Sequence, residues 1–195
     1  FLAPISAAVA ENDQKKHQLL NQSIHVVSIL NQTSTALLAT SDLLTNSPDM
    51  DPGVIEATLA RYANQVDGIR SILVLNDRGE LLYDTYNKIA SRRTPLKLNL
   101  GDREYFKGAL NQPDMTLYAP VKGRTSGSLF LPISQAVMTN ELVKYVAVAI
   151  ISPNRLIHPS VIQTEYSLVT IFNKQGKLLA KFPDGTDIPE NFYGS

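Results

Sequence analysis

The sequence predicts an α+β fold in which a long N-terminal helix packs on an antiparallel sheet, followed by the start of a second, related lobe. Three observations support this prediction. Residues 11–45 contain no Pro or Gly and repeat apolar side chains at helical spacing. Segments rich in β-forming residues then alternate with turn signals. One hairpin sequence occurs twice, first from Ile72 and again from Val169.

Composition narrows the possible function classes. The 195 residues, 44% of them hydrophobic, suffice for one generous domain with a real core. Because 18 Lys and Arg balance 18 Asp and Glu, no excess of basic charge indicates nucleic acid or an anionic membrane surface. The lack of Cys excludes disulfides, thiol catalysis and cysteine-based zinc sites.

Residues 1–10 are nearly all apolar or small. They are too few to span a bilayer, which takes about 20 apolar residues. They fit a tag, a mature start after signal cleavage, or the outer end of a transmembrane helix. We expect the last, because a helical pattern follows without a break.

The pattern over residues 11–46 predicts a single long helix. Leu20, Val27, Leu30, Leu37 and Leu44 follow the rhythm of an apolar helical seam. Such a seam packs the helix on its own domain or pairs it with a second copy of the chain, and both can hold at once.

A shorter helix is expected from Pro52, closed by Asp67-Gly68. A hairpin should follow, with Gly79 in its turn where a positive φ is needed. Residues 72–82 align without gaps on 169–179, with Asn, Gly and a Leu-Leu pair identical. This alignment indicates a duplicated lobe, whose second copy is followed by too few residues to complete a sheet.

Residues 87–99 are polar and basic and should form a surface loop. Asp102 is the expected N-cap of a helix over 103–111. Three more strands are expected at 116–121, 128–137 and 142–151, which with the first hairpin make a five-stranded, PAS-like sheet. Pro132 favours an edge or a bulge in the middle strand of the three, and Pro153 should start a short helix.

The sequence contains no constellation typical of catalysis. His17 and His25 are eight residues apart, whereas two helical His that share a metal are four apart. Residues 123–127 (Gly-Arg-Thr-Ser-Gly) have neither the Gly-Lys-Ser/Thr of a phosphate loop nor the order of a nucleophile elbow. We therefore expect no enzyme activity, no metal and no cofactor in this chain.

Arg103 and Tyr105 are the best candidates for ligand binding. A guanidinium holds a carboxylate through two parallel charge-assisted hydrogen bonds, and a Tyr beside it can close the pocket. Tyr118 could join them from the next strand. In the structural alternative, Arg103 pairs with a surface acid such as Asp102 or Glu104, while the aromatic residues anchor the helix to the sheet.

Four segments stand in an informative order: 102–106 (Asp-Arg-Glu-Tyr-Phe), 120–127 (Pro-Val-Lys-Gly-Arg-Thr-Ser-Gly), 131–134 (Leu-Pro-Ile-Ser) and 152–156 (Ser-Pro-Asn-Arg-Leu). In this order they resemble the double Cache (PDC-type) sensor domains of bacterial histidine kinases, diguanylate cyclases and chemoreceptors. The resemblance covers about residues 11–182. It implies a long helix that leaves a first transmembrane segment and two PAS-like lobes, of which the membrane-distal one holds the ligand.

The resemblance also implies site residues. Amino-acid-binding members carry Arg-x-Trp-Tyr on the helix, Tyr-x-Asp on the next strand and a further Asp near the end of the sheet. Here Arg103 matches the Arg, Pro120 replaces the strand Asp, and 149–152 contains no acid. The resemblance therefore favours a carboxylate or other anion without an ammonium group. The expected ligand-binding residues are Arg103, Tyr105, Tyr118, Arg124, Gln135 and Ser152.

The expected function is ligand sensing by the periplasmic part of an inner-membrane receptor whose output domain is a diguanylate cyclase or a histidine kinase. The alternative is a PAS-like structural or dimerisation domain without a small-molecule ligand. The expected partners are a small molecule and a second copy bound through the N-terminal helix, with a membrane tether and no nucleic acid. The expected organisation is a tag or membrane-proximal end (1–10), the long helix (11–46), a membrane-distal lobe (47–157), and a connector with a partial second lobe (158–195).

Overall fold

A computed structural model describes residues 3–86, 98–162, 168–173 and 176–183. The predicted α+β class, with a long helix ahead of an antiparallel sheet, is confirmed. The loop expected at 87–99 lies almost wholly outside the described residues. None of the described helices has a stretch long and apolar enough to cross a lipid bilayer.

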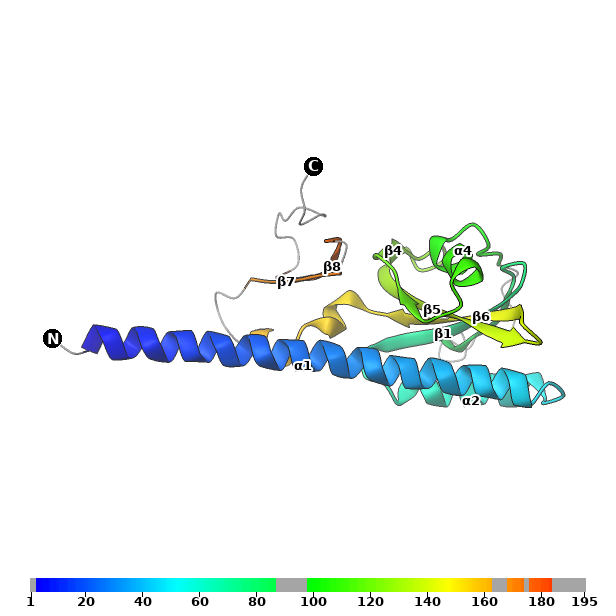
Figure 1. Cartoon of the computed structure of the whole chain (residues 1–195), viewed down its shortest axis with the longest axis horizontal. Helices are drawn as coiled ribbons and strands as arrows, with labels where there is room; N and C mark the ends of the chain where they lie inside the picture. Colours follow the sequence, from blue (N-terminus) through cyan, green and yellow to red (C-terminus); the bar gives the residue numbers. More distant parts are fainter. Residues whose placement is uncertain (1–2, 87–97, 163–167, 174–175, 184–195) are drawn as a thin grey trace.

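Helix α1 (Ala3–Asn46) runs as one rod and projects well beyond the sheet at its N-terminal end (Figure 1). Its C-terminal half buries one face, which includes Leu37 and Leu44. Two Thr on that face, Thr33 and Thr40, bond their hydroxyls to backbone carbonyls one turn earlier, which satisfies these buried polar groups.

The apolar seam predicted for α1 is wrong as a single surface, because it mixes two faces of the helix. Leu37 is fully buried and Leu44 is 5% exposed, whereas Leu20 and Val27 are each 55% exposed. Leu30 is half-buried against the core. The C-terminal members of the seam therefore pack on their own domain, and the N-terminal members face away from it.

Helix α2 (Pro52–Asn64) lies beside the C-terminal end of α1 (Figure 1). The Asp51 carboxylate caps it by accepting from the backbone N–H groups of Gly53 and Val54. Pro52 occupies the first turn, where its missing N–H is no loss.

The main sheet is antiparallel and has six strands, with the order β2-β1-β6-β5-β3 and β4 paired with β5. The strands are β1 (Ile69–Asn76), β2 (Leu81–Asp84), β3 (Thr116–Leu117), β4 (Val121–Lys122), β5 (Leu129–Thr139) and β6 (Leu142–Ile151). Five strands were expected, and the sixth arises because the segment 116–121 splits into β3 and β4.

Pro132 explains where that split falls. It lies on β5 opposite the gap between β3 and β4, and its carbonyl accepts from Tyr118 N at 3.0 Å. Because N–H and C=O of one residue point to the same side of an antiparallel strand, the missing N–H also faces this gap. Pro132 was expected to mark an edge or a bulge, but β5 is an inner strand and pairs with β6 in regular register at the proline. Instead, the strand on its other side is interrupted there.

The sheet separates two apolar layers. Alternate residues such as Val74, Ile133 and Ala147 face α1 and α2, whereas Leu73, Phe130 and Val148 face helix α4 (Glu104–Asn111) on the opposite side (Figure 1). The α4 side also holds the cavity described below.

Beyond the sheet, β6 leads into a 3-10 turn η1 (Pro153–Leu156) and the short helix α5 (Pro159–Ile162). The amide of Gln22 ties this connector to α1, donating to Leu156 O at 2.5 Å and accepting from His158 N at 2.8 Å. His25 Nε2 lies 2.9 Å from Arg155 O.

A separate two-stranded sheet is formed by β7 (Val169–Phe172) and β8 (Leu178–Phe182). Its turn has the same hydrogen bonds as the β1–β2 turn, because Asn76 and Asn173 each exchange bonds with the residue four positions later. Gly79 and Gly176 have φ of 78° and 76°. The two hairpin sequences that align therefore also share one turn geometry.

Candidate ligand-binding site

A cavity of about 350 Å³ lies on the α4 side of the sheet. It is lined by residues of β1, β2, the segment 98–105, the turn 123–128, β5 and β6: Arg70, Ser71, Leu73, Leu81, Asp84, Tyr86, Leu98, Leu100, Arg103, Tyr105, Gly123, Arg124, Thr125, Ser126, Ser128, Phe130 and Ile150. Its volume is in the range of small-molecule sites. Three of the six predicted ligand-binding residues, Arg103, Tyr105 and Arg124, line it.

Arg103 directly precedes α4, and its guanidinium turns towards the β4–β5 turn. Its Nη2 donates to Lys122 O at 3.3 Å, which fixes one side of the fork. Its Nε is buried and has no hydrogen-bond partner in the described part of the chain. Arg103 rather than Asp102 is the N-cap residue, and it makes no side-chain cap bond.

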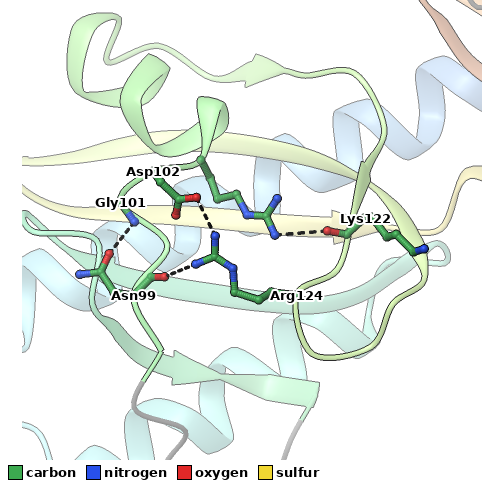
Figure 2. A network of polar contacts seen from close by, with 6 residues as sticks. Asn99, Gly101, Asp102, Lys122 and Arg124 are labelled. Atoms are coloured by element: carbon green, nitrogen blue, oxygen red, sulfur yellow. Dashed lines mark hydrogen bonds and ion pairs between the residues drawn. The ribbon is translucent and has the colours of Figure 1, made fainter.

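Arg124 explains why the predicted Asp102 cap is wrong. Its Nη2 lies 2.6 Å from Asp102 Oδ2, and its Nη1 donates to Asn99 O at 2.8 Å (Figure 2). This hydrogen bond holds the pKa of Asp102 below its usual value. A bond to a full positive charge has displaced the weaker capping bond, so the turn 123–127 is joined to the segment that leads into α4.

Tyr105 is 2% exposed and packs edge-on against Phe130, with ring centroids 6.3 Å apart. Burial raises the pKa of its hydroxyl to about 12, so the group stays protonated. The Ser134 hydroxyl donates to Tyr105 O at 2.7 Å and fastens α4 to the sheet.

Two charged residues of the cavity, Arg70 and Asp84, were not among the predicted site residues. The Arg70 guanidinium lies over the rings of Tyr86 and Phe130, at 5.8 and 5.7 Å from their centroids. Burial raises the pKa of Asp84, which accepts from Tyr86 N at 3.0 Å. A charged residue inside an otherwise apolar strand was the only signal for Arg70, and Asp84 had none.

Asp84 also corrects the argument about the ligand. An anion without an ammonium group was expected because Pro120 and residues 149–152 provide no acid. The cavity nevertheless contains a carboxylate, that of Asp84 on β2. The lack of acids at Pro120 and 149–152 therefore does not by itself exclude an amine.

The other predicted residues, Tyr118, Gln135 and Ser152, lie outside this cavity. The Tyr118 ring crosses α4 at Gly108, where an added Cβ would overlap its hydroxyl. Gln135 is two residues from both Ile133 and Val137 on β5, so it lies on the same face of the sheet as they do. That face packs against α1, on the side opposite to the cavity. Ser152 donates its backbone N–H to Gly68 O near the end of α2.

No group of three potential metal-binding side chains occurs among the residues that the structure describes. Among the described residues, the cavity is lined by guanidinium groups, aromatic rings, hydroxyls and the Asp84 carboxylate. Such a set can bind a small polar molecule.

Comparison with known proteins places the fold. No protein-family model matches the sequence, and neither does any curated protein. The extracellular domain of rpHK1S-Z16, a protein assigned as a histidine kinase, is similar over 94% of this chain and 76% of its own, with a TM-score of 0.73 and 20% identity.

Two chemoreceptor domains are also similar. The ligand-binding domain of Pseudomonas fluorescens CtaA in complex with L-serine has a TM-score of 0.67 and 14% identity, over 91% of this chain and 74% of its own. The sensory domain of Campylobacter jejuni Tlp3 with isoleucine bound has a TM-score of 0.63 and 12% identity, over 93% and 76%. At these identities the similarity shows the fold, which is that of extracellular sensory domains, as the Cache resemblance predicted.

Proposed function

We propose that the chain is the extracytoplasmic ligand-sensing domain of a bacterial transmembrane receptor and that the cavity beside α4 binds its ligand. The observation that carries the proposal is the convergence of Arg103, Tyr105 and Arg124 on one cavity of small-molecule size. The fold supports it, since solved examples hold L-serine and isoleucine. The domain itself is not an enzyme, and its output domain is a histidine kinase or a diguanylate cyclase.

A ligand acts in such a domain by binding one arrangement of the protein more tightly than another. The cavity is bounded by α4 and the turn 123–128 on one side and by β1 and β6 on the other. Strand β6 leads directly into η1, which is bonded to α1. We propose that this path carries the signal to the N-terminal helix and the membrane.

A thermal-shift screen against organic acids, amino acids and amines tests the proposal. We expect saturable stabilisation by at least one compound and a weaker shift in Arg103→Ala. The matched control is Arg61→Ala, because Arg61 is exposed on α2, on the opposite side of the sheet. A panel without any saturable shift would support the alternative, a structural domain without a ligand, for which the Arg124–Asp102 ion pair would be purely architectural.

We further propose a homodimer formed through α1. Leu20, Ile24, Val27 and Leu38 are 52–58% exposed, and their spacing of four, three and eleven residues keeps them on one stripe. Asn31 continues the stripe, at a position where a polar residue specifies the pairing of two helices. The stripe faces away from the buried face that contains Leu37. One face of the helix therefore packs on its own domain, and in this proposal a different face pairs with a second copy.

The dimer is tested by sedimentation. Val27→Asp places a charge in the stripe and is expected to shift a concentration-dependent dimer towards monomer. At concentrations where the parent is also monomeric, the two should have the same melting temperature. The control Leu142→Asp adds the same charge at a residue that is 73% exposed in the β5–β6 hairpin, and it should leave the dimer intact. Identical sedimentation of both variants and the parent would contradict the proposed interface.

We also propose the lobe organisation stated for the sequence, with 47–157 as the membrane-distal lobe and 158–195 as a connector and part of a second lobe. The shared turn geometry of the β1–β2 and β7–β8 hairpins supports it, as does the register shift at the equivalent step in each.

A further inference from the structure

We propose that Arg70 is the carboxylate-binding residue of the cavity, a role that the sequence suggested for Arg103. The inference rests on the proposed function, since it names the chemistry of that site. The ligand it implies is a small organic acid whose carboxylate is held by the Arg70 guanidinium.

A β-bulge directs Arg70 into the cavity. Ile69 pairs with Ile151 and Ser71 with Ile150, so Arg70 is one extra residue in β1. In a regular strand, Arg70 and Ser71 would point to opposite faces, whereas here both line the cavity. Bulges that turn a side chain in this way are frequent beside functional sites.

The donors of Arg70 are available to a ligand. Its guanidinium contacts the Tyr86 and Phe130 rings and attracts the Asp84 carboxylate, but it has no hydrogen bond or close ion pair within the described residues. A ring contact covers the face of a guanidinium and leaves its in-plane N–H groups to bind a carboxylate by two parallel bonds. The rings thereby hold the group in place before the ligand arrives.

The other two guanidinium groups are already engaged. Arg124 bonds Asn99 and Asp102. Arg103 bonds Lys122 O through Nη2, and its Nε, although it has no hydrogen-bond partner among the described residues, is buried. Binding a ligand through them would require breaking contacts that join the turn 123–127 to α4. Arg70 needs no such rearrangement, which makes it the better anchor.

The test compares three variants by calorimetric titration with acetate, succinate, L-serine and L-isoleucine, together with neutral sugars and amines. Arg70→Met keeps the apolar stem and removes the charge, and we expect at least one acid to bind about 10- to 100-fold more weakly. Arg70→Lys keeps the charge without the fork and should lose less. Arg61→Met, the same change outside the cavity, should bind like the parent.

Asp84→Asn distinguishes the two kinds of acid. Removal of this negative charge should strengthen binding of an acid without an amine and weaken binding of an amino acid, whose ammonium group it can attract. Stronger binding of a simple acid and weaker binding of an amino acid both support a carboxylate on Arg70, provided that Arg70→Met weakens the binding of the same compound.

Acid binding that is unchanged in Arg70→Met but lost in Arg103→Met would overturn the assignment and leave the sensing function standing. Binding of only sugars or amines would do the same. If no compound binds the parent, both the assignment and the proposed function fail. Melting curves confirm that each variant is folded, and Arg70→Lys serves the test if Arg70→Met does not fold.

Discussion

Leu37→Ala is expected to lower the free energy of unfolding by about 2–5 kcal/mol. Leu37 is fully buried where α1 packs on the sheet and α2, in the cluster that contains Leu59, Ile133 and Ala149. Truncation there removes apolar contacts and leaves a cavity that the surrounding strands cannot close. Urea unfolding followed by circular dichroism measures the change.

The neighbouring residue provides the control. Leu38 is 52% exposed on the solvent-facing side of the same turn, so Leu38→Ala should change stability by less than about 0.5 kcal/mol in the monomer. Equal losses in the two variants would mean that α1 does not pack on the sheet through the face described.

Gly79→Ala is expected to destabilise the domain by about 2–4 kcal/mol. Gly79 has a φ of 78°, and an added Cβ would overlap the backbone N and Cα of Gly101. The overlapping atoms belong to main chain that is bonded in place, since Leu100 N donates to Gly79 O at 2.7 Å. Relief therefore requires moving the segment that positions Arg103.

Gly127→Ala is the control that separates the cost of a positive φ from the cost of atomic overlap. Its φ of 66° is also positive, but an added Cβ meets nothing within 4 Å. We expect a cost of only about 1 kcal/mol from backbone conformation. If Gly79→Ala costs no more than Gly127→Ala, the close approach of the 76–79 turn to Gly101 is not present in solution.

Much of the fold could be predicted from local signals. The long helix follows from the absence of Pro and Gly, and each hairpin follows from an Asn and a Gly three positions apart in its turn. The apolar seam of α1 could not be assigned to one face, because spacing alone does not say which Leu meets the domain and which meets solvent. Leu37 and Leu20 occupy equivalent positions of the repeat, but Leu37 is fully buried and Leu20 is exposed to solvent.

The site was harder to predict because it depends on non-local pairing. Asp102 has the sequence features of a cap, but Arg124, 22 residues away, provides a stronger partner. Arg70 enters the cavity only through a one-residue register shift between β1 and β6, and hydrophobic alternation carries no sign of that shift. Gln135 was misplaced for a related reason, since its face of β5 is fixed by the packing of its neighbours against α1.

The buried amide of Gln22 sets the position of the connector along the axis of α1. It is satisfied on both sides, by Leu156 O and His158 N. A slide of one residue, about 1.5 Å along the axis, would break both bonds and leave a buried amide unpaired, at a cost of about 1–3 kcal/mol. Helix and connector therefore share one axial register, and a displacement of the connector along the helix must carry α1 with it.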